Sequence, residues 1–229
     1  MAALRGRNHS DLCALVPLLY SLSYRDLAEI LSERGLSVVH TTIFRWVQRY
    51  SPEIDKRSRP HLKSTNDSWR VDETYVKISG KWMYLYRAVD STGQTLDFLL
   101  NQTRNTRAAK RFLRKALGRP IASVPRVINV DKNPTYIGAV RDLKQEQLLS
   151  EQCKRRASRS MNNIVEQDHR FVKCKISPGL GFGSYPTAWR TIQGYEMMNM
   201  SKKGQIDGIE KGNVQGQNQF IAGLFGVAA

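Results

Sequence analysis

Apolar residues in the first fifty positions recur with helical spacing. They stand at i, i+3 and i+4 within residues 24–34 and again within residues 41–50. This spacing gathers them on one side of a helix, so it predicts two short amphipathic helices. A further helix over residues 11–22, bent or interrupted at Pro17, would complete a three-helix unit. The apolar residues of the two helices are Leu27, Ile30, Leu31, Ile43, Trp46 and Val47.

The residues around these helices suit helix ends. Gly35 fits the position that follows a helix C-terminus, and Thr41 or Thr42 offers a hydroxyl that could cap the second helix. A unit of this kind resembles a helix-turn-helix DNA-binding domain, in which the second helix enters the major groove. A structural helical hairpin is the alternative, because the connection is longer than in the tightest version of the motif. The candidate DNA-contacting residues of the second helix are Thr42, Arg45, Gln48 and Arg49.

The pattern changes after a polar segment. Residues 51–68 contain two prolines and no apolar periodicity, which indicates a linker. The stretches WRVDETYVKI (69–78), WMYLYRAVDS (82–91) and QTLDFLLN (94–101) have strand composition, and SGK and STG separate them as turns. This region therefore predicts three consecutive antiparallel strands.

Helices and a further strand follow. Helical patterns cover residues 104–117, 134–147, 161–172 and 185–200, and an apolar strand covers residues 126–131. Three meandering strands followed by alternating helices and strands predict a mixed sheet with helices packed on it. In the last of these helices Ala188, Ile192, Tyr195 and Met198 are available to pack against the sheet. The remaining residues are loop-like and then apolar, which suggests a docked C-terminal helix or a dimer contact.

The net charge of the chain suggests a binding partner. The net charge is +16 and the pI is about 10.0, and such a surface attracts polyanions, nucleic acid above all. Residues 71–160 hold 18 basic and 8 acidic side chains, and residues 104–119 hold seven basic residues without an acid. Residues 153–159 add four more. The alternative is an ordinary solvated helix face.

Several classes of protein are disfavoured. The sequence has no uninterrupted run of 18 apolar residues and no signal-peptide pattern at its N-terminus, so we expect a cytoplasmic protein without a membrane partner. Its three cysteines are far apart and have no histidine cluster beside them, which argues against a disulfide framework or a zinc site.

Three acids stand where an apolar element would prefer another residue. Asp72 lies inside the first strand, Asp131 ends the fourth, and Glu166 is embedded in NNIVEQDH on a helix. Taken singly, each is explained by an ion pair or a strand end. Taken together, neighbouring strands could bring the two aspartates face to face, and the glutamate could complete the set. Carboxylate ligands of this kind suit two Mg²⁺ or Mn²⁺ ions that act on phosphate esters.

The stretches that carry these acids resemble the DDE transposases, a branch of the ribonuclease-H-like polynucleotidyl transferases. The similarity is greatest to the insertion-sequence-six family. It covers nearly the whole chain, and Lys173 matches a basic residue that the family places seven positions after the glutamate. The matching stretches are SYRDLAEILSERG, TTIFRWVQRY, WRVDETYVKISGKWMYLYRAVDS, NVDKNP, NNIVEQDHRFVK and the tail from KKGQ to FGVAA.

The resemblance implies a ribonuclease-H-like mixed five-stranded sheet, preceded by a small helix-turn-helix domain. It implies that Asp72, Asp131 and Glu166 are the catalytic, metal-binding residues and that Lys173 contacts DNA. The domains would be a helix-turn-helix domain at 1–52, a linker at 53–68, a catalytic domain at 69–200 and a C-terminal tail at 201–229.

The expected function is that of a transposase that binds terminal inverted repeats and catalyses metal-dependent DNA cleavage and strand transfer. Its partners would be double-stranded end and target DNA and further copies of the chain, a dimer or higher oligomer, on the nucleoid of a bacterium or archaeon. Two alternatives stay open: a ribonuclease-H-like nuclease, and an inactive DNA-binding remnant or regulator.

Overall fold

The computed structural model describes residues 18, 22–131, 133–157, 163–177 and 180–226. By their contacts these residues form two compact units, Met1–Leu62 with Val172–Ala229, and Lys63–Phe171. The predicted helix over residues 11–22 falls almost entirely outside the described residues. The elements of the first unit are α3 (Tyr24–Glu33), α4 (His40–Ser58), η1 (Arg59–His61), α8 (Tyr185–Lys202) and α9 (Val214–Leu224). The elements of the second unit are β1 (Ser68–Ile78), β2 (Lys81–Asp90), β3 (Thr95–Asn101), α5 (Thr106–Leu117), β4 (Val127–Val130), α6 (Thr135–Gln145) and β5 (Lys154–Ala157). Helix α7 (Asn163–Ile176) begins in the second unit, and its residues from Val172 on belong to the first.

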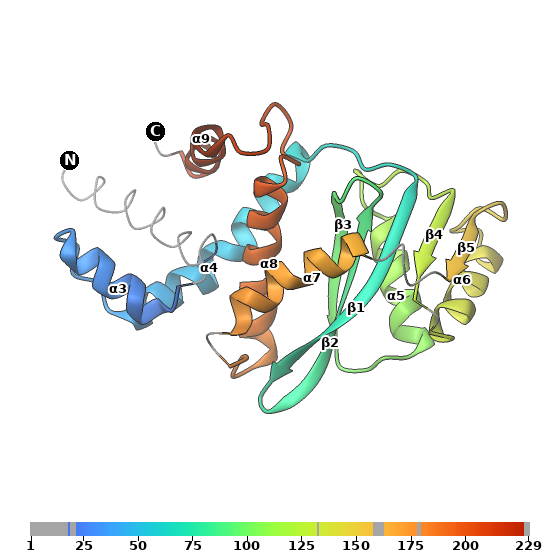
Figure 1. Ribbon diagram of the computed structural model, residues 1–229, viewed down its shortest axis with the longest axis horizontal. Helices are drawn as coiled ribbons and strands as arrows, with labels where there is room; N and C mark the ends of the chain where they lie inside the picture. Colours follow the sequence, from blue (N-terminus) through green and yellow to red (C-terminus); the bar gives the residue numbers. More distant parts are fainter. Residues whose placement is uncertain (1–17, 19–21, 132, 158–162, 178–179, 227–229) are drawn as a thin grey trace. The chain divides into compact units, whose positions relative to one another are not determined.

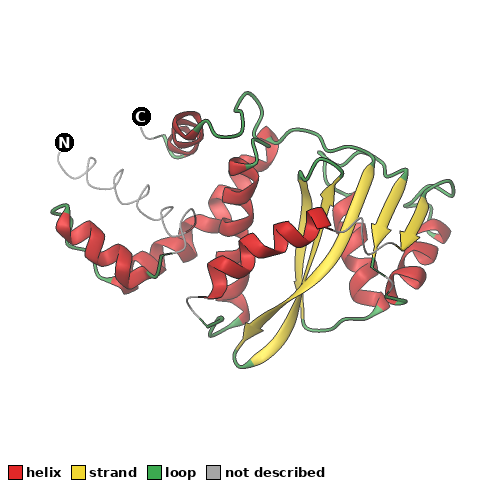
Figure 2. Cartoon of the chain, in the orientation of Figure 1, coloured by secondary structure: helices red, strands yellow, loops and turns green. Residues whose placement is uncertain are grey.

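One five-stranded sheet forms the centre of the second unit, with the strand order β3-β2-β1-β4-β5 (Figures 1 and 2). The first three strands are antiparallel neighbours, as the two short turns between them require. Strand β4 is parallel to β1, and β5 is parallel to β4. The structure therefore confirms the predicted ribonuclease-H-like mixed sheet flanked by helices.

Each face of the sheet is covered by different helices. On one face, α5 and α6 pack their apolar sides onto the strands, and Tyr86 of β2 contacts Phe112 of α5. Its neighbour Arg87 points to the other face, because successive strand residues alternate. There it forms an ion pair with Asp168 of α7, which crosses this face in Figure 1.

Strand β5 is an unpredicted element made from a basic segment. Residues 153–159 suggest only positive surface charge, yet Lys154–Ala157 pair in parallel with β4. The strand is the last in the sheet order, and Lys154 and Arg156 are exposed on it. The sequence did not predict it because its four residues show no apolar alternation.

Helices α3 and α4 form as predicted, but α4 begins before the predicted first residue, Thr41. Leu27, Leu31 and Ile43 make a small buried core between the two helices, and Gly35 follows α3 with a positive φ of 78°. The predicted cap at Thr41 or Thr42 is wrong, because α4 starts at His40 and its N-cap is Val39 without a side-chain hydrogen bond. Both threonines therefore lie within the first turn of the helix.

Helix α4 continues through Pro52 to Ser58, so the first part of the predicted linker is helical. Its buried residues recur at Ser51, Ile54, Asp55 and Ser58, the spacing of one helix face. This face packs against α8. A Cβ added to Gly194 of α8 would lie 2.4 Å from the Ser51 hydroxyl oxygen, so the two helices approach closely. We expected α8 to pack against the sheet; in the structure it packs on α4.

The C-terminal segment folds as a docked helix, one of the two predicted alternatives. Helix α9 contacts α4 and α8, and the Arg57 guanidinium donates to the Leu224 carbonyl at 2.7 Å. Phe225 makes an edge-to-face contact with Tyr50. None of the helices within the described residues is long and apolar enough to cross a membrane.

Candidate active site

Asp72 and Asp131 stand on neighbouring parallel strands. The pairing of β1 with β4 aligns Trp69 with Ile128 and Arg70 with Asn129. Continued by two residues, this register brings Asp131, directly after β4, level with Asp72. Neighbouring strands are about 4.8 Å apart, so a register continued in this way would place the two predicted acids side by side.

Asp72 faces the side of the sheet that carries α7. Its Oδ2 lies 3.3 Å from the Nε2 of His169, and its side chain is 19% exposed. Burial lowers the pKa of His169, so this imidazole is predominantly neutral at pH 7. Next to it, the buried Arg87 holds Asp168 at 2.8 Å. Two consecutive residues of α7 thus fix the helix to the strands that carry Asp72.

Glu166 lies in the first turn of α7 and is exposed. It precedes His169 by three residues and therefore shares a helix face with it. Three residues of helix correspond to a rise of about 4.5 Å. Glu166 therefore lies about one helical turn along α7 from the residue that contacts Asp72.

Glu73 points to the opposite face and is nearly buried, with a side chain 2% exposed. Its carboxylate accepts hydrogen bonds from the Tyr136 hydroxyl, the Arg104 guanidinium and, at 3.2 Å, the Asn133 amide. Burial raises the pKa of Glu73, and the Tyr136 hydrogen bond and the Arg104 charge oppose this rise. The sequence indicates no role for Glu73, and the only signal for this position is that successive strand residues point to opposite faces.

Asp131 is held from two sides. The backbone N–H of Asn133 donates to its Oδ1 at 2.9 Å, and the Arg104 Nη2 donates to its Oδ2 at 3.0 Å. One third of the Asp131 side chain is exposed. Arg104 therefore bridges Asp131 and Glu73, a role that its position in a basic run did not suggest.

The donor types fit a divalent cation. Asp72, Asp131 and Glu166 supply only carboxylate oxygens, which Mg²⁺ and Mn²⁺ prefer, and all three are at least partly exposed. A cationic group, the Arg104 guanidinium, already occupies one of the Asp131 oxygens. Within the described ranges no three acidic, histidine or cysteine side chains lie close enough together to enclose a metal ion. Asp72, Asp131 and Glu166 are therefore not gathered into one ligand set among the described residues.

The basic run 104–119 is less available for DNA than its charge suggests. Five of its seven basic residues form ion pairs with carboxylates, leaving Arg107 and Arg111 as exposed residues outside these pairs. These five residues form seven ion pairs: Arg104 with Glu73 and Asp131, Lys110 with Asp142 and Glu146, Arg114 with Glu146, Lys115 with Asp97, and Arg119 with Asp97.

The predicted DNA-contacting residues differ in their surroundings. Arg45 and Arg49 are exposed on α4, and Lys173 is exposed on α7. Thr42 is half-buried. The Gln48 amide donates to the Thr191 hydroxyl at 2.8 Å, so this side chain holds α4 against α8.

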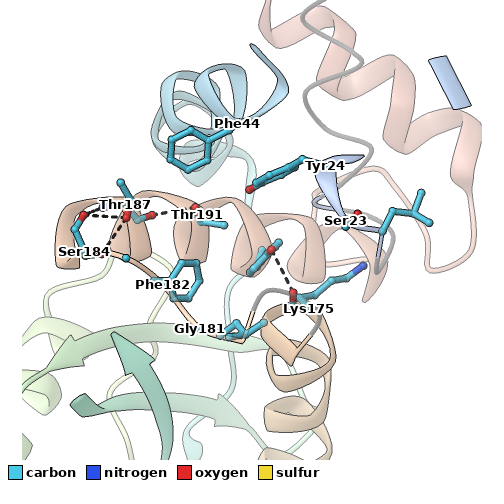
Figure 3. A pocket seen from close by; sticks show the side chains of 13 residues that line it. Ser23, Tyr24, Phe44, Lys175, Gly181, Phe182, Ser184, Thr187 and Thr191 are labelled. Atoms are coloured by element: carbon cyan, nitrogen blue, oxygen red, sulfur yellow. Dashed lines mark hydrogen bonds between the residues drawn. The ribbon is translucent and has the colours of Figure 1, made fainter. Parts of the chain in front are cut away.

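A separate cavity of about 410 Å³ lies in the first unit (Figure 3). Tyr24, Phe44 and Phe182 line its apolar part, and hydroxyl groups of the α8 N-terminal turns line another part. Lys175 also lines it, although this residue is only 9% exposed. Burial, with a smaller contribution from Lys202, lowers the pKa of Lys175 to about 8.

Replacing Lys175 with methionine is expected to stabilise the protein at pH 7. Unfolding restores the ordinary pKa near 10.5, so at neutral pH the folded state bears the cost of a buried charge, about 1 to 3 kcal/mol. Above the unfolded pKa both states are neutral and this cost disappears. Urea unfolding of Lys175→Met should show a gain at pH 7 that shrinks between pH 8 and 10, whereas the exposed Lys173→Met should show none. A gain in the free energy of unfolding that does not change with pH would contradict the explanation by a buried Lys175 charge.

Comparison with known proteins adds independent findings. A family model described as a DDE domain matches residues 66–205. The transposase for the insertion sequence-like element IS431mec of Staphylococcus aureus strain N315 is 38% identical over 179 residues, 78% of this chain and 77% of that protein. The transposase for insertion sequence element IS257 in transposon Tn4003 of S. aureus has the same identity and coverage. Among solved structures, the HTLV-2 integrase catalytic core domain in complex with magnesium aligns with a TM-score of 0.46 and 15% identity, over 69% of this chain and 97% of that chain.

Proposed function

Since the chain belongs to the insertion-sequence-six family of DDE transposases, we propose that it binds the terminal inverted repeats of its own element and moves that element. It nicks the DNA at each end and joins the freed 3′-hydroxyl to target DNA. The substrate is double-stranded DNA of the nucleoid, and two ends in one reaction call for a homo-oligomer of the chain. The domain map with boundaries after residues 52, 68 and 200 belongs to this proposal.

The observation that supports the proposal is the register of β1 and β4, which pairs Arg70 with Asn129 and, continued by two residues, would align Asp72 with Asp131. Two carboxylates on adjacent strands repel each other unless a cation lies between or beside them. Glu166 on α7 would add a third negative charge. In a chain with a net charge of +16, this local concentration of acids supports a cation site where an anionic DNA backbone can approach.

We assign Asp72, Asp131 and Glu166 as the residues that would hold two Mg²⁺ or Mn²⁺ ions. Such ions, when bound, polarise the scissile phosphate and lower the pKa of the attacking water or hydroxyl. The protein itself orients the carboxylates. His169 contacts Asp72, and the Arg87–Asp168 pair fixes α7 to the sheet.

The test is incubation of the purified chain with DNA that carries a candidate inverted repeat, together with Mg²⁺ or Mn²⁺. Denaturing gels separate nicked ends from ends joined to target DNA. Joined products that depend on the metal support transposition. Hydrolysis without joining, on any duplex, would instead favour the ribonuclease-H-like nuclease, which has the same acids but no use for end recognition.

DNA-end recognition is assigned to the helix pair α3–α4. Arg45 and Arg49 are exposed at helical spacing, so their guanidinium groups can reach phosphates or base edges. Thr42 and Lys173 are further proposed contacts. Because Gln48 is engaged with Thr191, it would have to leave α8 to read DNA, and its contribution is expected to be smaller.

Replacing both Arg45 and Arg49 with alanine is expected to weaken specific end binding at least tenfold, since each lost phosphate or base contact weakens an electrostatic interface. The slope of the affinity against salt concentration should fall by about 2. Gel shifts at several salt concentrations measure both effects. The matched control removes two other exposed charges, Arg25 and Lys56. Equal losses in the two double variants would show that α4 contributes only general charge.

A further inference from the structure

A buried carboxylate next to the first catalytic acid takes no part in the mechanism above. Glu73 follows Asp72 on β1 but points to the other face, where its side chain is 2% exposed. Three donors from two segments converge on it: Arg104, which precedes α5, and Asn133 and Tyr136, which lie three residues apart around the start of α6. Burying an acid is unfavourable without such partners, so this concentration of donors indicates a residue that organises its surroundings.

Arg104 connects Glu73 to the second catalytic acid. Its Nε donates to Glu73, and its Nη2 donates to the Asp131 Oδ2 at 3.0 Å. A planar guanidinium has its donors in a fixed fork, so fixing one nitrogen also fixes the others. The orientation of the Asp131 carboxylate consequently depends on the position in which Glu73 holds Arg104.

Asn133 makes a second connection between the same groups. Its side-chain amide donates to Glu73 at 3.2 Å, and its backbone N–H donates to the Asp131 Oδ1 at 2.9 Å. Asn133 accepts in turn from the Thr135 N–H at 3.1 Å, which joins the cluster to the start of α6. Asp131 is thus tied twice to Glu73 and through it to β1, the strand of Asp72.

The charges of Glu73 and Arg104 affect the binding of a cation to Asp131. A guanidinium on Asp131 repels a divalent cation approaching the same carboxylate. Glu73 offsets this charge, because the Glu73–Arg104 pair is neutral as a whole. Without the Glu73 charge, Arg104 would bear its full positive charge beside Asp131 alone.

We propose that Glu73 and Arg104 are positioning residues of the active site: Arg104 orients Asp131 beside Asp72, and Glu73 anchors Arg104 and neutralises it so that a divalent cation can bind Asp131. The inference rests on the proposed function, since it assigns Asp131 to the cation site. A purely structural ion pair would affect folding but would leave the cation affinity of the folded protein unchanged.

The experiment measures Mn²⁺ binding to the full chain without DNA, from the electron paramagnetic resonance signal of free Mn²⁺. Glu73→Gln keeps the size of the side chain and removes its charge, so we expect about tenfold weaker binding, the lower end of the effect of outer residues on metal sites. Arg104→Gln should bind Mn²⁺ at least as tightly as the wild type, because the repelling charge is gone. The double variant should return to within about threefold of the wild type, since the two charge effects cancel.

The rate of strand transfer is a second measurement, and we expect the variants to affect it differently from Mn²⁺ binding. Arg104→Gln should lose about 10- to 100-fold in rate despite its intact Mn²⁺ affinity, because Asp131 loses its orientation. Arg107→Gln, which removes an exposed charge three residues further along, in the first turn of α5, is the matched control and should change neither measurement. Thermal unfolding of each variant identifies any loss that comes from misfolding.

The variant Asp131→Asn distinguishes the assignment of the cation site from the positioning role of Glu73 and Arg104. If this variant binds Mn²⁺ as the wild type does, the assignment of the cation site itself is wrong. If it binds weakly while folded Glu73→Gln is unchanged, the site stands and the positioning role is refuted. Equal losses in Glu73→Gln and in the double variant would also overturn the proposal, because charge balance would then play no part.

Discussion

Replacing Glu166 with glutamine is expected to abolish strand transfer while leaving DNA-end binding intact. The substitution preserves shape but removes one of three negative charges from the proposed cation site. A bound metal contributes several kcal/mol to transition-state stabilisation, and each 1.4 kcal/mol changes the rate tenfold. We therefore expect a loss of about a thousandfold or more. Because Glu166 is exposed, the fold should be unaffected.

Joined and nicked DNA products are quantified for this variant beside a gel shift on end DNA. The control is Glu151→Gln, an equally exposed acid outside the site, which should retain full activity. Strand transfer in Glu166→Gln at the wild-type rate would remove this residue from the catalytic set. End binding without any metal-dependent strand transfer in the wild type would instead favour a DNA-binding regulator whose acids are structural.

The second large effect concerns stability. Asp168→Ala is expected to destabilise the protein by about 3 to 5 kcal/mol, because it leaves Arg87 charged in the interior without the carboxylate at 2.8 Å. The Arg87 side chain is fully buried and that of Asp168 is 8% exposed, so water cannot replace the lost partner. Urea unfolding measures the change in the free energy of unfolding.

An exposed pair in the same unit provides the matched control. Asp67 and Arg126 lie 3.3 Å apart with side chains 48% and 66% exposed, and Asp67→Ala should cost only about 0 to 1 kcal/mol. Replacing both buried partners, as in Arg87→Met with Asp168→Leu, should recover much of the loss. Similar small losses for the buried and exposed single variants would show that the buried pair contributes little.

The sheet and the placement of Asp72 and Asp131 could be predicted because strand signals are local. The β1 segment is rich in β-branched and aromatic residues, and Asp131 follows a short apolar strand, so composition alone indicated their elements. The role of Arg104 could not be predicted. Its ion pairs cross 31 and 27 positions of sequence, and in the sequence it stands as one basic residue among seven.

The length of α4 could not be predicted from the sequence either, for a different reason. Pro52 and the polar residues after it suggested a linker, yet the helix continues to Ser58. Its buried face contains Ser51, Asp55 and Ser58 and only one large apolar residue, Ile54. Small polar side chains allow the close approach to Gly194, which hydrophobic periodicity does not detect. Packing against α8 therefore compensates for the backbone hydrogen bond that Pro52 cannot make.

The basic strand β5 constrains how copies of the chain could assemble. An edge strand with free backbone groups invites a second copy to extend the sheet, but lysine and arginine side chains along that edge oppose such growth. Two copies meeting edge to edge through Lys154 and Arg156 would bring like charges together. An oligomer that holds two DNA ends is thus expected to use other surfaces, unless the phosphates of a duplex neutralise both edges and act as the bridge between them.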